Sequence, residues 1–231
     1  MPLTSYDIAQ MIDLSAVQAN DGDQSLEGLV HVAKEHRCYL VTALPSQILL
    51  LKDLLKCDRD IRIGGNVGFP SGGQTTHIKI AEARELVELG CDELDVVINI
   101  AKLVSGRYGE VLDELRAVVD AAERCPVKVI LECHYLSENQ IKIGCDLTIK
   151  AGAAFVKTGT GWAPTGATLS NITLIKSHVG DAIKIKASGG IRDIDTLINM
   201  YRCGACRFGV SYQWAGEILK RAAKLPRPFM L

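Results

Sequence analysis

The sequence predicts a closed (β/α)₈ barrel with one extra helix at its N-terminus. Short apolar, β-branched runs alternate with amphipathic segments of helical length along the whole chain of 231 residues. Runs that are hydrophobic throughout indicate strands of a parallel sheet covered by helices. Eight strand–helix units in a chain of this length favour a closed TIM barrel over an open, doubly wound sheet.

The elements follow one another in a regular order. Strands are predicted at 11–15, 38–44, 61–69, 93–99, 127–133, 153–158, 182–188 and 206–211. Helices are predicted at 46–57, 77–90, 108–123, 137–152, 168–179, 193–204 and 213–224. Segment 77–90 repeats apolar residues every three or four positions and ends on a glycine, and 137–152 opens with a Ser-x-x-Gln capping box. No Pro-rich linker or shift in composition marks a boundary, so residues 1–231 are predicted to form one domain.

Composition excludes several classes of partner. The net charge is −1, from 26 basic and 27 acidic residues, which indicates neither a nucleic-acid nor an anionic-membrane surface. The N-terminal stretch MPLTSYDIAQMIDLS has two acids and no long apolar core, so we predict no secretory signal. No apolar run approaches the roughly 20 residues that cross a bilayer. Eight cysteines in such a chain are predicted to be reduced thiols of a cytoplasmic protein.

Cys203 and Cys206 have CxxC spacing. A redox CxxC follows a strand and opens a helix, whereas this pair closes a predicted helix and leads into a strand. A second ligand pair for structural zinc is also missing. We therefore interpret the two cysteines as small buried residues around a tight turn.

Polar residues interrupt the apolar strands near their C-terminal ends, where the active sites of such barrels lie. They are Asp13, Thr42, Asn66, Asp95 with Asn99, 132–134, Lys157, Lys186 and Ser211. Lys157 is the most anomalous, because it ends the apolar run Ala154, Phe155, Val156. Two lysines and an aspartate at neighbouring strand ends predict a catalytic group.

Two lysines brought close together repel, so one of them loses its proton more easily, and burial acts in the same direction. A neutral amine near pH 7 can attack a carbonyl and form a Schiff base. The carboxylate of Asp95 is suited to hold the second lysine charged and to pass protons through water. Because an iminium is itself an electron sink, this chemistry needs neither a metal nor a cofactor.

A phosphate site is predicted beside these residues. Gly189 and Gly190 lie between a strand and a helix, and Gly209 and Ser211 lie on the next strand. Backbone N–H groups at such glycines approach anions closely, and this is the usual phosphate position of the fold. The GTGW segment at 159–162 lacks the third glycine of a dinucleotide fingerprint, so NAD is not expected.

Along nearly its whole length the chain resembles deoxyribose-phosphate aldolase, a family of class I aldolases on a (β/α)₈ barrel. The matching segments, in the family's order, are MIDLS, NVGFPSGG, DELDVVIN, VKVILE, GAAFVKTGTG, KASGGIR and RFGVS. The resemblance implies that Lys157 forms the Schiff base, that Lys186 lowers its pKa and that Asp95 completes a proton relay. It further implies a pocket for substrate or phosphate lined by Asp13, Thr160, Gly189, Gly190, Gly209 and Ser211.

The activity implied is the reversible, cofactor-free cleavage of 2-deoxy-D-ribose 5-phosphate to D-glyceraldehyde 3-phosphate and acetaldehyde. The resemblance also implies a homodimer. Four positions at the rim depart from the family's pattern. Tyr212 replaces a second serine, Trp162 follows KTGTG where KTSTG is usual, and Thr42 stands where some relatives have a cysteine. His134 follows Glu132 and Cys133 where Glu-Thr-Gly is usual, and we interpret it as a pocket wall ahead of a general acid or a ligand.

Three alternatives remain open on this sequence. The first is an aldolase of the same mechanism with a different, even unphosphorylated, aldehyde acceptor. The second is a non-catalytic ligand-binding barrel, against which the Lys–Lys–Asp set argues. The third is a sugar-phosphate isomerase or epimerase, which would need an acidic base and no lysine pair. The apolar tail 225–231 is expected to cover the barrel mouth, to dock on a partner subunit or to be disordered.

Overall fold

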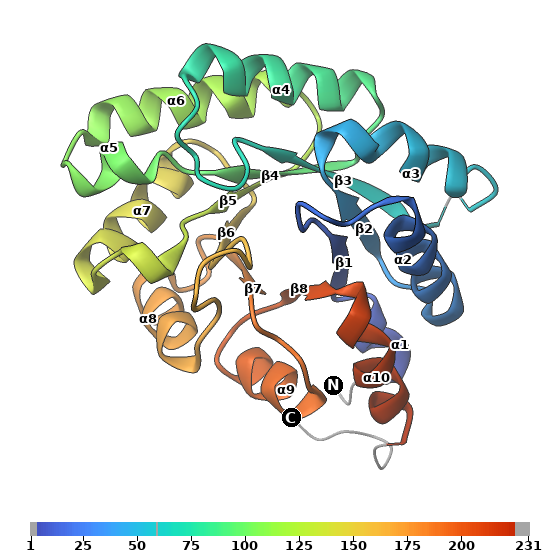
Figure 1. The fold of residues 1–231 in the computed structure, drawn as a ribbon. Coiled ribbons are helices and arrows are strands. Elements are labelled where there is room, and N and C mark those ends of the chain that lie inside the picture. Colours follow the sequence, from blue (N-terminus) through green and yellow to red (C-terminus); the bar gives the residue numbers. More distant parts are fainter. Residues whose placement is uncertain (1–3, 59, 225–231) are drawn as a thin grey trace.

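The computed structural model describes residues 4–58 and 60–224, in which eight parallel strands close into a barrel ringed by helices (Figure 1). The strands are β1 (Ile12–Ala16), β2 (Leu40–Ala43), β3 (Arg62–Val67), β4 (Glu93–Val97), β5 (Val127–Ile130), β6 (Phe155–Lys157), β7 (Lys184–Ser188) and β8 (Arg207–Ser211). Each strand pairs with the next, and β8 pairs with β1. The predicted (β/α)₈ barrel is therefore confirmed.

The helices also follow the prediction, except that α2 was given no range in the sequence analysis. They are α1 (Ser5–Ala9), α2 (Asp23–His36), α3 (Ile48–Leu54), α4 (Thr76–Glu88), α6 (Tyr108–Ala121), α7 (Glu138–Lys150), α8 (Leu169–Val179), α9 (Ile194–Arg202) and α10 (Tyr212–Lys224). α1 is the extra N-terminal helix, and its first turn is closed by a capping box of Thr4 and Asp7. The capping box predicted for α7 is present as well, with Ser137 and Gln140 as its partners.

Three short elements were not predicted, namely α5 (Ile100–Val104) and the 3₁₀ helices η1 (Pro45–Gln47) and η2 (Cys133–Tyr135). β5 ends at Ile130 instead of residue 133, because Glu132 adopts a left-handed conformation with φ of 55° and turns the chain. Asn99, one of the predicted strand-end residues, accepts a hydrogen bond from the Lys102 N–H and caps α5. The Asn99 side chain therefore serves as the N-cap of α5.

The strands separate an apolar outer face from a charged barrel interior. On β4, Leu94 and Val96 belong to the hydrophobic core between the sheet and the helices. Glu93 and Asp95 alternate with them and are buried inside the barrel. The period-two alternation of a strand is therefore retained, but its inner face carries ion pairs in place of apolar side chains.

The CxxC pair lies in the predicted turn between α9 and β8, and neither cysteine is in a disulfide. The expectation that both are buried is wrong, because Cys203 is half-buried and Cys206 is exposed. The tail 225–231 lies outside the described residues. Within the described ranges, none of the helices combines the length and the apolar character needed to cross a membrane.

One ion pair outside the barrel fastens the end of β4. The Lys79 ammonium is fully buried between α4 and α6, where it donates to Glu114 Oε1 at 2.6 Å and to the Val97 carbonyl at 2.8 Å. Thr76 donates to the other oxygen of Glu114 at 3.0 Å. Through its bond to the Val97 carbonyl, Lys79 fixes the backbone of β4 two residues after Asp95.

Removing one partner of this pair is expected to destabilise the fold strongly. Lys79→Met leaves a buried carboxylate without its closest cation, so the free energy of unfolding should fall by about 3 kcal/mol in urea denaturation. The double variant Lys79→Met/Glu114→Leu should recover part of that loss. Lys56→Met, which breaks an exposed pair with Asp53, should change stability by less than about 1 kcal/mol. Equal losses for Lys79→Met and Lys56→Met would contradict this role.

Candidate active site

The site is built around the carboxylate of Asp95, which is buried in the middle of β4. Its Oδ2 accepts hydrogen bonds from Lys157 Nζ at 2.7 Å and from Lys186 Nζ at 2.8 Å. Barrel register explains the meeting, because Lys157 and Lys186 are direct neighbours on β6 and β7. Thr158 and Ser188 exchange two hydrogen bonds of 2.9 Å just beyond them, which joins the ends of the two strands.

Three further charged residues, missed by the sequence analysis, complete this arrangement. Lys128 on β5 donates to Asp95 Oδ1 at 2.9 Å and pairs with Glu93 Oε2 at 2.6 Å. Arg207 on β8 donates to Asp13 Oδ1 at 2.8 Å. A signal for Lys128 existed, since it interrupts the apolar run VKVIL as Lys157 interrupts FVKT.

We call these seven side chains the ion cluster. In the part of the chain that the structure describes, it holds four cations and three carboxylates: Lys128, Lys157, Lys186, Arg207, Asp13, Glu93 and Asp95. With every group ionised, the cluster has one positive charge in excess. Losing one proton from one lysine would balance it.

Electrostatics indicate which lysine loses that proton. Burial lowers the pKa of Lys157 to about 8, against an ordinary value of 10.5, with Asp95 opposing the shift and Lys186 adding to it. Burial acts on Lys128 too, but its three carboxylate neighbours outweigh it and raise the pKa. The Asp95 carboxyl has a pKa well below its usual range, because the surrounding ammonium groups outweigh its burial. Lys157 therefore loses its proton more easily than an ordinary lysine.

Lys157 faces a small inner pocket at the barrel mouth. This pocket is lined by Asp13, Ser15, Val17, Thr42, Asn66, Phe69, Lys157, Thr160, Lys186, Ser188 and Gly209. Thr42, predicted at the rim, is buried in its wall and accepts a hydrogen bond from the Asn66 amide at 2.9 Å. The pocket thus places hydroxyl and amide groups around the Lys157 amine.

An outer pocket of about 310 Å³ continues from the inner one, and the two share Ser15, Val17, Thr160, Ser188 and Gly209. It brings together the predicted phosphate residues Gly189, Gly190, Gly209 and Ser211, and adds Arg192. Gly189 and Gly190 have φ of 96° and 82°, a region that favours glycine. A Cβ on Gly190 would meet no atom within 4 Å, so a ligand has room to approach its backbone.

The loop after β6 is held by Glu132 and bridged across the mouth by Trp162. Thr160 donates to Glu132 through both its backbone N–H and its hydroxyl. A Cβ on Gly159 would lie 2.8 Å from Glu132 Oε1, so KTGTG avoids a clash that a serine would bring here. Trp162 donates through Nε1 to the Val17 carbonyl at 2.9 Å and meets Phe69 edge-on. Burial raises the pKa of the Glu132 carboxyl.

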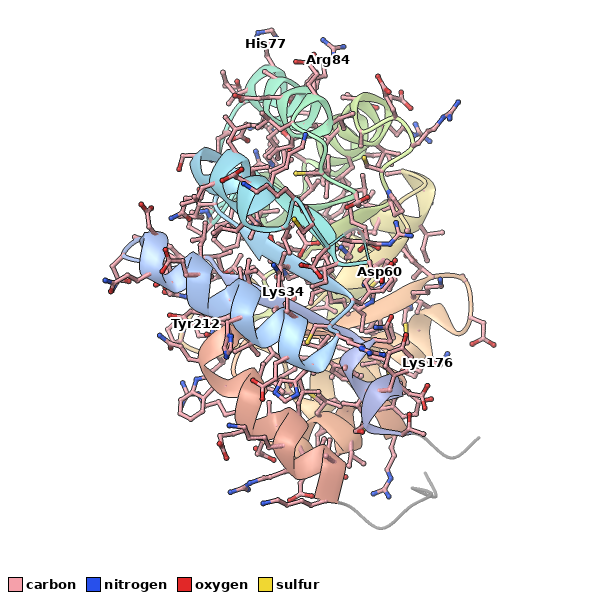
Figure 2. All side chains as sticks on the ribbon, turned by 90° about the vertical axis from the view of Figure 1, so that its right-hand side faces the viewer. Lys34, Asp60, His77, Arg84, Lys176 and Tyr212 are labelled. Atoms are coloured by element: carbon pink, nitrogen blue, oxygen red, sulfur yellow. The ribbon has the colours of Figure 1, made fainter. Side chains whose placement is uncertain are left out.

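Two of the predicted rim residues lie away from both pockets. Tyr212 opens α10, and its ring lies against Gly28 of α2, where an added Cβ would come within 3.0 Å of it (Figure 2). His134 is exposed, with Nδ1 2.7 Å from the Thr165 hydroxyl. Neither residue lines the inner or the outer pocket, and the role of His134 as a pocket wall stays a prediction.

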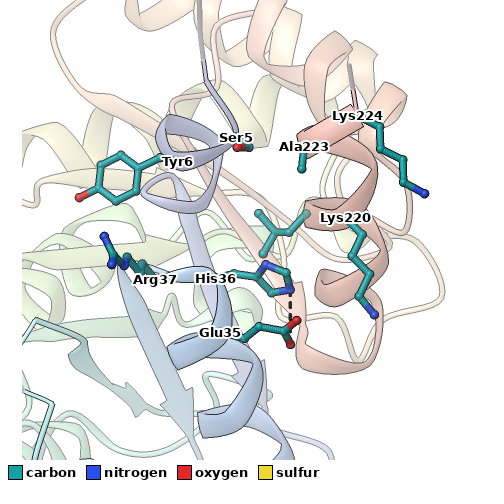
Figure 3. A pocket seen from close by; sticks show the side chains of 9 residues that line it. Ser5, Tyr6, Glu35, His36, Arg37, Lys220, Ala223 and Lys224 are labelled. Atoms are coloured by element: carbon teal, nitrogen blue, oxygen red, sulfur yellow. Dashed lines mark ion pairs between the residues drawn. The ribbon is translucent and has the colours of Figure 1, made fainter. Parts of the chain in front are cut away.

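A larger cavity, of about 430 Å³, lies elsewhere, between α1, the end of α2 and α10 (Figure 3). Its lining includes Glu35, His36, Arg37, Lys220 and Lys224, and no residue from the C-terminal end of a strand. Because the reactive amine and the glycine loops lie in the two smaller pockets, the chemistry belongs there.

Comparisons with known proteins agree with this geometry. A family model described as "DeoC/LacD family aldolase" matches residues 8–213. The chain is 44% identical over 224 residues to a deoxyribose-phosphate aldolase of Sinorhizobium medicae, covering 97% of this chain and 90% of the relative. It is 41% identical over 228 residues to one from Klebsiella pneumoniae, covering 98% and 92%.

Solved structures give the same result. A structure described as "QR15, an Aldolase" superimposes with a TM-score of 0.87 at 37% identity, covering 95% of this chain and 99% of that one. A deoxyribose phosphate aldolase from Aeropyrum pernix, described as tetrameric, gives 0.86 at 26% identity, covering 94% and 91%.

A closed (β/α)₈ barrel with a buried lysine of lowered pKa at its mouth fits an aldolase, a class of lyase. The chain belongs to the DeoC/LacD family of aldolases. The family resemblance of the sequence segments is confirmed over nearly the full length.

The lowered pKa of Lys157 has a consequence for stability. A lysine with a lower pKa in the folded state destabilises the fold below pH 8, and the cost disappears as pH rises from 8 toward 10.5. Lys157→Met should therefore gain stability relative to wild type, by about 2 kcal/mol more at pH 7 than at pH 10. Urea denaturation at both pH values measures this difference.

The matched control is Lys150→Met, an exposed lysine at the end of α7, which should show no such pH dependence. A stability difference for Lys157→Met that is the same at both pH values would contradict a depressed pKa.

Proposed function

We propose that the protein is a class I aldolase that reversibly cleaves 2-deoxy-D-ribose 5-phosphate to D-glyceraldehyde 3-phosphate and acetaldehyde. The observation that carries this proposal is the buried Lys157 amine, with its pKa near 8, at the inner end of a pocket that continues to Gly189 and Gly190. The deoxyribose-phosphate aldolases to which the chain is similar support the same substrate.

The reaction follows from the neighbours of Lys157. Its neutral amine attacks the aldehyde carbon C1 of the open-chain sugar, and water leaves as the iminium forms. A base then takes the proton of the C3 hydroxyl, the C2–C3 bond breaks, and its electron pair moves into the iminium to give an enamine. Glyceraldehyde 3-phosphate leaves, the enamine is protonated at C2, and water releases acetaldehyde from Lys157.

Asp95 and Lys186 are suited to move these protons. Their 2.8 Å contact lies within the hydrogen-bonding range of a proton relay, and Asp95 also contacts the reacting amine. The ionised Asp95 carboxylate favours the positive charge of the iminium that replaces the ammonium of Lys157. No metal and no cofactor enters any step of this proposal.

The outer pocket is suited to hold the 5-phosphate. The backbone of Gly189 and Gly190 and the start of α10 supply N–H groups, and Ser211 supplies a hydroxyl. Arg192 adds a positive charge and lies 5.4 Å from the centre of the Trp214 ring, which fixes its guanidinium. We further propose a cytoplasmic location, which the free thiols of the eight cysteines support.

Covalent trapping tests the mechanism. With acetaldehyde and borohydride, the wild type should gain one ethyl group, located on Lys157 by peptide mass spectrometry. Lys157→Met should gain none and should lose cleavage activity by at least about four orders of magnitude. A wild-type protein without an adduct, or a Lys157→Met variant that still cleaves the sugar, would contradict the proposal and favour a non-catalytic barrel.

Substrate comparison tests the phosphate. The ratio kcat/KM should be at least about a hundredfold higher for 2-deoxyribose 5-phosphate than for 2-deoxyribose, because charge-assisted hydrogen bonds to phosphate are lost. Arg192→Gln should raise KM for 2-deoxyribose 5-phosphate about tenfold and leave KM for 2-deoxyribose unchanged. Arg202→Gln, on the exposed side of α9, is the control. Equal kcat/KM for both sugars would favour the aldolase with an unphosphorylated acceptor.

A further inference from the structure

Glu93 and Arg207 form a layer of charge directly beneath the reacting groups. Each precedes an inward-facing residue by two positions, Glu93 before Asp95 on β4 and Arg207 before Gly209 on β8, so both point into the barrel. Neither lines the inner or the outer pocket. Glu93 is buried, and the side chain of Arg207 is 12% exposed, so water screens their charges weakly.

Glu93 shares a partner with Asp95, and Arg207 shares one with Lys186. Glu93 Oε2 forms an ion pair with Lys128 Nζ at 2.6 Å, and Lys128 Nζ also pairs with Asp95 Oδ1 at 2.9 Å. Arg207 forms an ion pair with Asp13 Oδ1 at 2.8 Å, and Lys186 Nζ lies 2.6 Å from the other oxygen, Asp13 Oδ2. Each of them therefore weakens the interaction of a shared charge with Asp95 or with Lys186.

Aromatic side chains fix this layer in place. The guanidinium of Arg207 lies 4.0 Å from the centre of the Tyr39 ring and 5.5 Å from that of Phe155. The Tyr39 hydroxyl donates to Glu93 Oε1 at 3.1 Å. Because stacking and hydrogen bonding hold both charges, neither can swing away to solvent when Lys157 gains or loses its proton.

We propose that Glu93 and Arg207 are positioning residues that set the charge of the Lys157 amine through Lys128 and Asp13. The inference rests on the proposed Schiff-base function. Without the charge of Glu93, Lys128 interacts only with Asp95 and Asp13, and less negative charge remains for a Lys157 ammonium. Without the charge of Arg207, Asp13 is released toward Lys186, and Asp95 is left freer to hold Lys157 protonated. The two changes act in opposite directions.

The other charged groups around Lys157 stay the same in both variants. They are Asp95 on β4, Lys128 on β5, Glu132 after β5, Lys186 on β7 and Asp13 on β1. The inner-pocket residues of β2 and β3, Thr42 and Asn66, are neutral. A shift in the titration of Lys157 can then be assigned to the single charge removed.

The test is the pH dependence of the rate at which acetaldehyde and cyanoborohydride alkylate Lys157. Glu93→Gln should move the acid limb of this profile about one pH unit lower, and Arg207→Gln about one unit higher. Arg207→Lys, which keeps the charge, should stay close to wild type. Arg62→Gln should also leave the profile unchanged, since Arg62 lies 5.3 Å from the same Tyr39 ring but outside the ion cluster.

Profiles that coincide with wild type, or that move in the same direction for both variants, overturn the inference. If Arg207→Gln does not fold, Glu93→Gln decides alone, because it keeps the shape of the side chain and predicts a shift toward lower pH. A wild-type protein that forms no adduct on Lys157 at any pH would overturn the proposed function itself. A wild-type adduct with unshifted variants would overturn only the role of Glu93 and Arg207.

Discussion

One carboxylate holds this site together, because Asp95 accepts hydrogen bonds from the ammonium groups of three lysines at once. These lysines come from β5, β6 and β7, so only a closed barrel in the observed register can bring them to the same two oxygens. Each buried ammonium alone would be costly, and their shared anion offsets that cost. The fold and the chemistry therefore depend on the same contact.

The cluster is balanced for reactivity at some cost in stability. Its four cations and three carboxylates leave one positive charge in excess, and burial makes Lys157 the group that releases a proton most easily. A barrel interior filled with apolar side chains would avoid this cost and lose the nucleophile. The surrounding hydrophobic core, with Leu94 and Val96 on the outer face of β4, offsets the cost of the charged interior.

The sequence predicted the barrel, Lys157, Lys186 and Asp95 because each of these residues interrupts an apolar strand near its end. It missed Lys128, Glu93 and Arg207 because their importance lies in the register between strands, as in the pairing of Lys128 with Asp95, which no single strand reveals. The orientation of the rim side chains was harder still to predict from the sequence. The start of α10 turns Tyr212 toward α2, a rotation that depends on the exact helix boundary.

The rotation of Tyr212 bears on what the outer pocket can bind. From the sequence, losing a serine hydroxyl at this position would be expected to weaken phosphate binding. The proposed site, however, depends mainly on backbone N–H groups. Gly189 and Gly190 keep the positive φ angles that turn those groups outward, and Arg192 provides a charge that Trp214 holds in place. The proposed anion site therefore rests on backbone geometry and on one guanidinium. Replacing one hydroxyl would therefore remove one hydrogen bond to the proposed phosphate and leave its backbone and guanidinium contacts in place.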